Sequence, residues 1–217
     1  MRDLLHPHRD PSEVLSAFVA PAQERGGDRP RVRINMVASV DGATAVDGES
    51  RGLSGDADRA VFHRLRAEAD VVMAGAATVR ADRYGPAKAD DAVRAAGAAR
   101  GQTPVPAVVV LTRGGDLPWE APLFTAADPA TVVAHPEDVT LPPAAADASA
   151  VRFVGVGRGS VDVAALLAVL GAEGVAQVLC EGGPGLIAQV AAAGCLDEAF
   201  VTVSPRLVSG DASRMMR

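Results

Sequence analysis

Residues 178–186 read Val-Leu-Cys-Glu-Gly-Gly-Pro-Gly-Leu, and this stretch says most about the fold of the chain. A valine-rich run ends at Glu181, and three glycines and a proline lead into the apolar sequence LIAQVAAA. Adjacent glycines permit unusual backbone dihedrals and close approach of a ligand, and proline suits the first turn of a helix. The pattern predicts a strand, a tight turn and a helix whose first N–H groups are open to an anion.

The same turn also has a plainer interpretation, in which it is only a glycine-rich connection. Glu181 favours a ligand site, because an acid at the carboxyl end of a strand lies where open α/β sheets bind ligands. Its carboxylate would repel a phosphate, so Glu181 is expected to face another group, such as the N–H groups of a substrate. We therefore expect a phosphate-bearing cofactor on one side of the turn and a polar heterocycle on the other.

Strands and helices alternate along most of the chain. Apolar, β-branched runs predict strands at 32–38, 70–74, 107–111, 131–134, 151–154, 175–180 and 200–203. Helices are expected at 11–19, from Ser54 or Asp56 to Ala69, and at 76–82, 162–170 and 184–193. Residues 88–102 are expected to form a helical insertion or a mobile loop. This alternation predicts an α/β fold with a mostly parallel, twisted sheet flanked by helices on both faces.

The composition excludes several classes of protein. Of the 217 residues 48% are hydrophobic, the net charge is −6, and nothing favours nucleic acid or an acidic membrane as a partner. No apolar run approaches the ~20 residues that span a bilayer, and the N-terminus lacks a secretory signal. Cys180 and Cys195 form neither a disulfide framework nor a metal site. We therefore expect a cytoplasmic protein without a metal.

A second glycine-rich stretch, residues 155–160 (GVGRGS), lies between a predicted strand and a predicted helix. Its spacing is GxGxG rather than the GxGxxG of a dinucleotide-binding turn. We interpret it as a turn capped by Ser160 or Asp162. At the end of the first strand, Ser39 and Asp41 fall on the same face, although Asp41-Gly42 is also a plain turn signal.

Three blocks, read in order, resemble the reductase domain of the riboflavin-pathway RibD family, which has a dihydrofolate-reductase-like fold. They are residues 35–42 (NMVASVDG), residues 63–82 (from HRLRAEAD to GAATVRAD) and residues 181–184 (EGGP), followed by Leu196-Asp197-Glu198 and Ser204-Pro205. The resemblance implies a reductase domain over residues 29–217, preceded by an N-terminal helix and linker over 1–28. The zinc deaminase half of bifunctional members is expected to be absent, since PCxxC does not occur.

The resemblance implies NADPH as hydride donor and a ribosylaminopyrimidine 5′-phosphate as substrate, whose ribosyl group is reduced to a ribityl chain in riboflavin biosynthesis. It also implies a homodimer. Positions that match cofactor contacts are Ser39, Thr78, Asp82, Thr112, Arg113, Gly182, Gly183, Pro184, Gly185 and Leu186. Thr112 and Arg113 would meet the 2′-phosphate, and Gly182-Gly183 would match a glycine pair that is often cis.

The substrate contacts implied in the same way are Asn35, Ser50, Arg66 and Glu181. Arg66 would bind the phosphate by a charge-assisted hydrogen bond, and Glu181 would accept hydrogen bonds from the pyrimidine. Asp41 or Glu181 would assist the proton movement that opens the ribose ring.

The chain departs from the family pattern at several positions. Asn35 replaces a usual lysine, residues 82–86 read DRYGP where the family has Asp-Asp-Pro, and Arg83 is the substitute candidate for a second phosphate contact. Ser209-Gly210 replaces a glycine pair, and the chain stops at Arg217 where relatives usually continue through a closing strand. Three alternatives stay open: a reductase of a pterin such as dihydrofolate, a non-catalytic nucleotide-binding protein, and a Rossmann dehydrogenase that uses Gly155 to Gly159.

Overall fold

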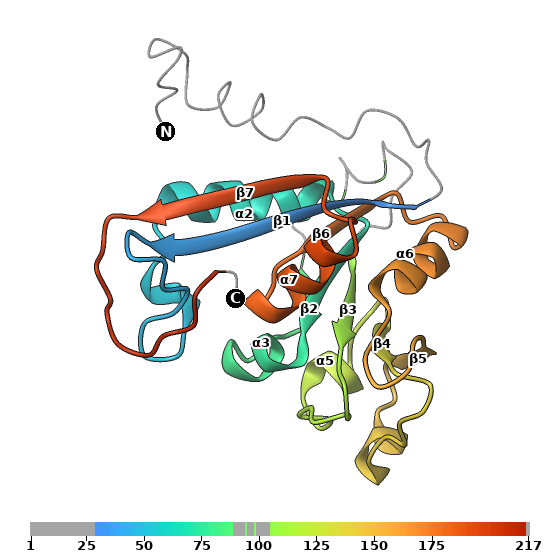
Figure 1. Ribbon diagram of the computed structural model, residues 1–217. Coiled ribbons are helices and arrows are strands. Elements are labelled where there is room, and N and C mark those ends of the chain that lie inside the picture. The colour runs from blue at the N-terminus through green and yellow to red at the C-terminus, as the bar shows by residue number, and fades with distance from the viewer. Residues whose placement is uncertain (1–28, 89–93, 95–97, 99–104, 216–217) are drawn as a thin grey trace.

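The computed structural model describes residues 29–88, 94, 98 and 105–215. Seven parallel strands form one twisted sheet in the order β5-β4-β3-β2-β6-β1-β7 (Figure 1). The strands are β1 (Arg31–Ser39), β2 (Val71–Gly75), β3 (Ala107–Leu111), β4 (Thr131–His135), β5 (Val151–Gly155), β6 (Gln177–Cys180) and β7 (Glu198–Ser204). The expected parallel α/β sheet is therefore confirmed.

Helices cover both faces of the sheet, as predicted. They are α2 (Asp56–Glu68), α3 (Ala76–Ala81), α5 (Pro122–Thr125), α6 (Val163–Ala172) and α7 (Pro184–Ala192), with 3₁₀ turns at Ser50–Gly52 and Pro143–Asp147. Two of the helices begin as their sequences require, because Asp162 accepts the Ala165 N–H at the start of α6 and Pro184 opens α7. The short helix α5 and both 3₁₀ turns carry no sequence signal and are additions to the prediction.

Alternate residues of each strand feed two layers of core. In β3, Val109 and Leu111 pack with α6 and α7, whereas Val108 and Val110 pack with α5 on the opposite face. On that opposite face α2 covers the other end of the sheet, where its Leu65 meets β6 and β7. The helix predicted at 11–19 and nearly all of the segment 88–102 lie outside the described residues.

The chain after β7 forms an irregular segment, residues 205–215, which we call the C-terminal strap. Figure 1 shows it leaving the end of β7, passing the loop after β1 and ending near α7. The N–H of Thr44 donates to the Ser213 carbonyl at 2.8 Å, and the N–H of Val40 donates to the Arg206 carbonyl at 3.0 Å. The strap is thus fastened to the loop that follows β1, at the carboxyl edge of the sheet.

Candidate active site

The candidate site lies where β6 runs between β1 and β2. The helix after β6, α7, packs on one face of the sheet, and the helix after β1, α2, packs on the other. Because all strands are parallel, their carboxyl ends lie at one edge, and open α/β sheets bind ligands at this edge where the following helices pass to opposite faces. Ser39, Gly75 and Glu181 all lie at this edge, which is where the sequence placed the candidate site.

The glycine turn after β6 packs closely against the start of α3. The Gly182–Gly183 peptide bond is cis, as the resemblance implies, and Gly182 has φ +92°. The N–H of Gly75 donates to the Gly182 carbonyl at 2.8 Å. A Cβ at Gly183 would lie 2.9 Å from Oγ1 of Thr78. Two predicted cofactor elements, the glycine turn and Thr78, are therefore in contact, and only glycine fits at position 183 without a shift.

The start of α7 keeps unused hydrogen-bond donors. The N–H groups of Leu186 and Ile187 donate to the Gly183 carbonyl at 3.0 and 3.1 Å. Within the part of the chain that the structure describes, the N–H groups of Gly183 and Gly185 make no hydrogen bond, and Gly185 is exposed. The turn is thus open to an anion, as the first N–H groups of a helix are when no side chain caps them.

Glu181 and Arg66 form the most tightly held pair of the site. Nε and Nη2 of Arg66 donate to the two carboxylate oxygens of Glu181 at 2.6 and 2.7 Å. Nη2 also donates to the hydroxyl of Tyr84 at 2.9 Å. The guanidinium carbon lies 4.3 Å from the centre of the Phe62 ring, a cation–π distance. The pair is held from three sides, which fixes the orientation of both charged groups.

Burial raises the pKa of the Glu181 carboxyl above its ordinary value, although the Arg66 guanidinium opposes this effect. The nearby Asp82 carboxylate raises the pKa further. Only 6% of the Glu181 side chain is exposed. A buried carboxyl with a raised pKa is a candidate for a group that transfers protons.

Asp41, the other residue predicted to move a proton, is placed differently. Its carboxylate accepts hydrogen bonds from the Ser39 hydroxyl at 2.6 Å and from the N–H groups of Val208 and Ser209 at 3.0 and 2.9 Å. These bonds, that from Ser39 above all, hold the pKa of Asp41 well below its usual range. A carboxylate with this pKa has no proton to give at neutral pH, so the structure argues against Asp41 as an acid.

Ser39 is buried, and its hydroxyl is already engaged. It donates to Asp41 and accepts the N–H of Ala43 at 2.8 Å. These bonds shape the turn after β1, and Asp41 fastens the C-terminal strap to it. The roles of Ser39 toward the cofactor and of Asp41 in proton transfer stay predictions.

Asn35 lies beside Glu181. Ile34 pairs with Cys180 in the register of β1 and β6, so the next residue of each chain segment, Asn35 and Glu181, is adjacent and on the α2 face. Asn35 is 9% exposed, and its Oδ1 has no hydrogen-bond partner among the described residues. A buried acceptor without a partner is costly, and this one lies next to the predicted substrate-binding acid.

Ser50 and Asp82 are brought together, although they were predicted for substrate and cofactor separately. The pKa of the Asp82 carboxyl is raised, chiefly because neighbouring groups shield it from water, while the N–H of Ser50 donates to it and lowers the pKa. The loop 46–52 therefore meets the end of α3. Arg83, the candidate second phosphate contact, is exposed in a left-handed turn with φ +48°.

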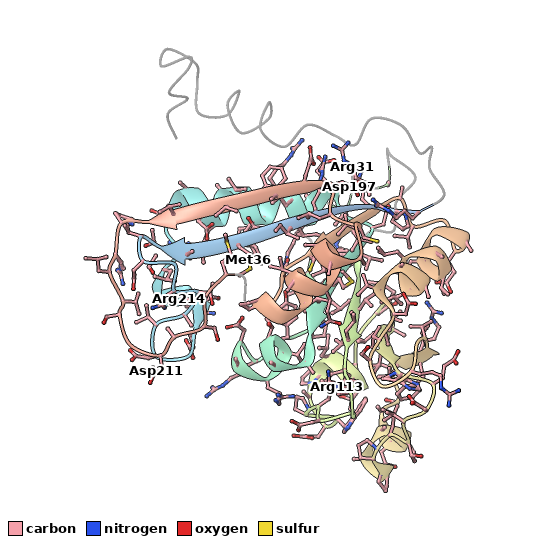
Figure 2. The ribbon with its side chains drawn as sticks, in the orientation of Figure 1. Arg31, Met36, Arg113, Asp197, Asp211 and Arg214 are labelled. Carbon is pink, nitrogen blue, oxygen red and sulfur yellow. The ribbon has the colours of Figure 1, made fainter. Side chains whose placement is uncertain are left out.

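Thr112 and Arg113 differ in whether their side chains are free to bind a ligand. Thr112 is buried, and its Oγ1 accepts the N–H of Gly115 at 2.9 Å, which shapes the loop after β3. Arg113 is exposed, in the loop near α5 (Figure 2), and makes no ion pair with any described residue. Arg80 of α3 donates to the Asp116 carbonyl at 2.6 Å and ties this loop to α3. Arg113 is thus an exposed cation in the loop after β3.

The second glycine-rich stretch is closed, as predicted for a plain turn. The N–H of Asp162 donates to the Val156 carbonyl at 3.3 Å, and the N–H of Gly159 donates to the Asp138 carboxylate at 2.8 Å. A Cβ at Gly157 would lie 2.5 Å from the Ser160 carbonyl oxygen. These contacts fill the space that a pyrophosphate would need.

Two residues of the site were missed by sequence reasoning, Phe62 and Tyr84. Phe62 precedes Arg66 by four residues on α2, and this spacing places two side chains on one face of a helix. Tyr84 is the only tyrosine of the chain and follows Asp82 by two residues. The helical spacing was a usable signal for Phe62, whereas nothing local connects Tyr84 with Arg66.

The parallel sheet, its strand order and the cis glycine pair after β6 are those of the dihydrofolate-reductase-like fold. The family model of the RibD C-terminal domain matches residues 30–217. A 2,5-diamino-6-ribosylamino-4(3H)-pyrimidinone 5′-phosphate reductase of Methanothermobacter thermautotrophicus is 30% identical over 195 residues, which are 87% of this chain and 83% of that protein. The chain therefore belongs to the RibD C-terminal domain family.

Solved structures agree with this fold. A pyrimidine reductase-like protein from Corynebacterium diphtheriae gives a TM-score of 0.78 at 20% identity, over 86% of this chain and 79% of that one. Acinetobacter baumannii RibD gives a TM-score of 0.67 at 27% identity, over 87% of this chain and 50% of that one. The first likeness concerns the fold alone.

Proposed function

We propose that the chain is an NADPH-dependent reductase of a ribosylaminopyrimidine 5′-phosphate, which converts the ribosyl group into a ribityl chain. The observation that carries this proposal is the open glycine turn next to a buried carboxyl that an arginine holds in place. The turn suits bridging phosphates, and the carboxyl suits a heterocycle rich in N–H groups. The archaeal relative, named as a reductase of a pyrimidinone 5′-phosphate, supports the same reaction.

NADPH would lie along the turn from Gly182 to Leu186, with Thr78 and Asp82 of the neighbouring segment beside it. The free N–H groups of Gly183 and Gly185 would hold its bridging phosphates. Exposed Arg113 would bind the 2′-phosphate and so favour NADPH over NADH. When bound, NADPH supplies the hydride. No metal-binding group of three or more His, Cys, Asp or Glu side chains occurs among the described residues.

Glu181 is the residue we propose for proton transfer. The ribosylamine opens to an imine when the N–H proton moves to the ring oxygen, and the imine carbon then accepts a hydride while its nitrogen takes a proton. Glu181 pairs with Arg66 as a carboxylate, and because burial raises its pKa, it would accept a proton from the substrate and return it during the reaction. Positioning of the reacting groups would contribute much of the rate, up to about 7–11 kcal/mol in well-oriented systems.

Arg66, Ser50 and Asn35 complete the proposed substrate contacts. Arg66 was expected to bind the phosphate, but its charge is already matched by Glu181. Only one of its three nitrogens, Nη1, has no hydrogen-bond partner among the described residues. Asn35 offers an acceptor where a lysine would offer a positive charge, and its free Oδ1 suits an N–H group of the heterocycle.

A pterin such as dihydrofolate remains the second candidate substrate. The observation that favours it is the absence of net positive charge where the phosphate was expected, because Arg66 is paired and Asn35 is neutral. Both substrate classes carry an aminopyrimidinone ring, so Glu181 would serve either. A purely nucleotide-binding protein would bind NADPH without oxidising it.

The protein is also proposed to form a homodimer. β7 lies at the edge of the sheet, and Val201 and Val203 on it are 44% and 64% exposed. Leu207, shortly after β7, and Val40, directly after β1, are also exposed. Such apolar exposure on an edge strand favours a protein partner. No described helix is long and apolar enough to cross a membrane. A cytoplasmic location stays a prediction.

The test is a parallel titration of NADPH and NADH, followed by turnover of the ribosylaminopyrimidine phosphate and of dihydrofolate by one preparation. The proposal expects tighter binding of NADPH and substrate-dependent oxidation with the pyrimidine. Faster turnover of dihydrofolate would favour the pterin reductase. Binding without oxidation of NADPH by either substrate would favour the non-catalytic alternative.

A further inference from the structure

The guanidinium of Arg66 has two edges that bind in different ways. Its Nε–Nη2 edge faces Glu181 and is fully used. Its Nη1–Nη2 edge is half used, because the second hydrogen of Nη2 points to the Tyr84 hydroxyl at 2.9 Å. The planar fork holds the N–H groups of one edge parallel. An oxygen that accepts from Nη1 would therefore lie beside the hydroxyl oxygen of Tyr84.

Tyr84 is fixed in this place by its backbone and by its ring. Its N–H donates to the Val79 carbonyl at 3.1 Å, and its ring packs against the core cluster that contains Ala74 and Val79. Its hydroxyl oxygen accepts from Arg66, so its own hydrogen is available, and no described residue accepts it. The site thus presents two neighbouring donors, the Tyr84 O–H and the Arg66 Nη1–H.

We propose that Tyr84 is a substrate-recognition residue, whose O–H and the Nη1–H of Arg66 together donate to the carbonyl oxygen of the aminopyrimidinone. This inference rests on the proposed function. A 4(3H)-pyrimidinone carries an N–H next to its carbonyl and, in the substrate of the archaeal relative, an amino group beyond it. The donors of Tyr84 and Arg66 match the carbonyl. The neighbouring acceptors of Glu181 and Asn35 match the N–H and the amino group.

The charges favour a carbonyl over a phosphate at this position. Glu181 balances the charge of Arg66, so the edge offers directed hydrogen bonds rather than net positive charge. Each carboxylate oxygen of Glu181 uses one acceptor site on Arg66 and keeps another for the ring N–H groups. Asn35 lies beside Glu181 on the neighbouring strand, and its unpartnered Oδ1 adds an acceptor on the same face of the sheet.

The experiment compares three probes on wild type and on Tyr84→Phe, which keeps the ring and removes the hydroxyl. The probes are 2,6-diaminopyrimidin-4-one, 2,4,6-triaminopyrimidine, which lacks the carbonyl, and ribose 5-phosphate, with dissociation constants from calorimetry. We expect Tyr84→Phe to weaken the pyrimidinone about five- to tenfold, as loss of one hydrogen bond does. Binding of the other two probes should change less than about twofold.

Phe62→Leu is the matched control, since it alters the other neighbour of the Arg66 guanidinium without removing a donor. It should weaken all ring probes alike and leave the preference for the carbonyl compound. Four results would overturn the inference. In Tyr84→Phe they are equal weakening of both ring probes, weakening of ribose 5-phosphate alone, or no change in any dissociation constant. The fourth is a wild type that does not bind the pyrimidinone. If wild type fails to oxidise NADPH with the pyrimidine substrate, the proposed function itself fails. If wild type oxidises NADPH with the pyrimidine substrate but Tyr84→Phe binds the pyrimidinone as tightly as wild type does, only the role of Tyr84 is ruled out.

Discussion

Arg66 and Glu181 are 115 residues apart in the chain and meet through two hydrogen bonds, Nε to Oε1 at 2.6 Å and Nη2 to Oε2 at 2.7 Å. The arginine comes from α2 on one face of the sheet, and the acid comes from the turn after β6. This pair joins α2 to the glycine turn after β6. It also sets which donor and acceptor atoms are left for a substrate.

The coupling of this pair is measurable by a double-mutant cycle. Arg66→Ala, Glu181→Gln and the double variant should show a coupling of about 1–3 kcal/mol in the free energy of unfolding. The reason is that each single change leaves the other group without its partner in a water-poor site. Urea unfolding of the four proteins gives the value. Additive effects of the two changes would mean that the pair contributes nothing.

Arg66→Ala should also raise the KM for the substrate far more than the KM for NADPH. The reason is that the proposed function assigns Arg66 to the substrate and the glycine turn to the cofactor. Steady-state kinetics with each ligand varied in turn provide the measurement. An equal rise in both constants would place Arg66 outside substrate recognition.

Gly183 and Gly185 form a matched pair for testing the turn. A Cβ at Gly183 would lie 2.9 Å from Thr78 Oγ1, whereas a Cβ at Gly185 would meet nothing within 4 Å. Gly183→Ala should lower stability by about 1–3 kcal/mol through overpacking, and Thr78→Ala in the same protein should restore part of it. Gly185→Ala should leave stability nearly unchanged. Thermal unfolding of the three variants and the wild type decides, and equal effects at both glycines would contradict the packing described.

Gly157→Ala separates the two glycine-rich stretches. Gly157 has φ +80°, and a Cβ there would lie 2.5 Å from the Ser160 carbonyl oxygen, so the substitution should destabilise the fold. The dissociation constant for NADPH should not change in the protein that remains folded, whereas Gly183→Ala should weaken NADPH binding. Fluorescence titration below the melting temperature tests both. Loss of NADPH binding in the Gly157 variant alone would revive the Rossmann alternative.

Asp41→Asn tests the fastening of the C-terminal strap through its pH dependence. The pKa of Asp41 lies well below its ordinary value of 3.8, so the carboxylate stabilises the folded state above pH 3.8. This contribution is lost as the pH falls below that value toward the folded-state pKa. The stability difference between wild type and Asp41→Asn should therefore shrink on acidification from neutral pH toward pH ~3. A difference that stays constant across this range would remove Asp41 as the charged fastening group.

Much of the fold could be predicted from the chain because its signals are local. Valine-rich runs such as residues 107–111 mark buried parallel strands, and Pro184 and Asp162 mark helix starts. The order of the strands could not be read in this way, since β6 enters between β1 and β2 only through long-range pairing. The short helix α5 depends on its burial against β3 and β4 rather than on its four residues.

In the site, too, local features could be predicted from the sequence, whereas long-range contacts could not. Glu181, the glycine turn and Thr78 were placed correctly at one edge, because residues at the ends of parallel strands must meet there. The fastening of the C-terminal strap by Asp41 could not be predicted, because Val208 and Ser209 lie more than 160 residues away and carry no signal of the contact. Tyr84 was missed for the same reason, since only the folded chain brings it to Arg66.

The most direct measurement is the rate of NADPH oxidation by the purified protein with and without the ribosylaminopyrimidine 5′-phosphate. A reductase with its cofactor on the Gly182–Leu186 turn and its substrate at Glu181 should oxidise NADPH only when the substrate is present. The rate should fall sharply in Glu181→Gln, while NADPH binding is retained. NADPH that binds but is never oxidised, or oxidation that Glu181→Gln leaves unchanged, would contradict the proposed reaction at this site.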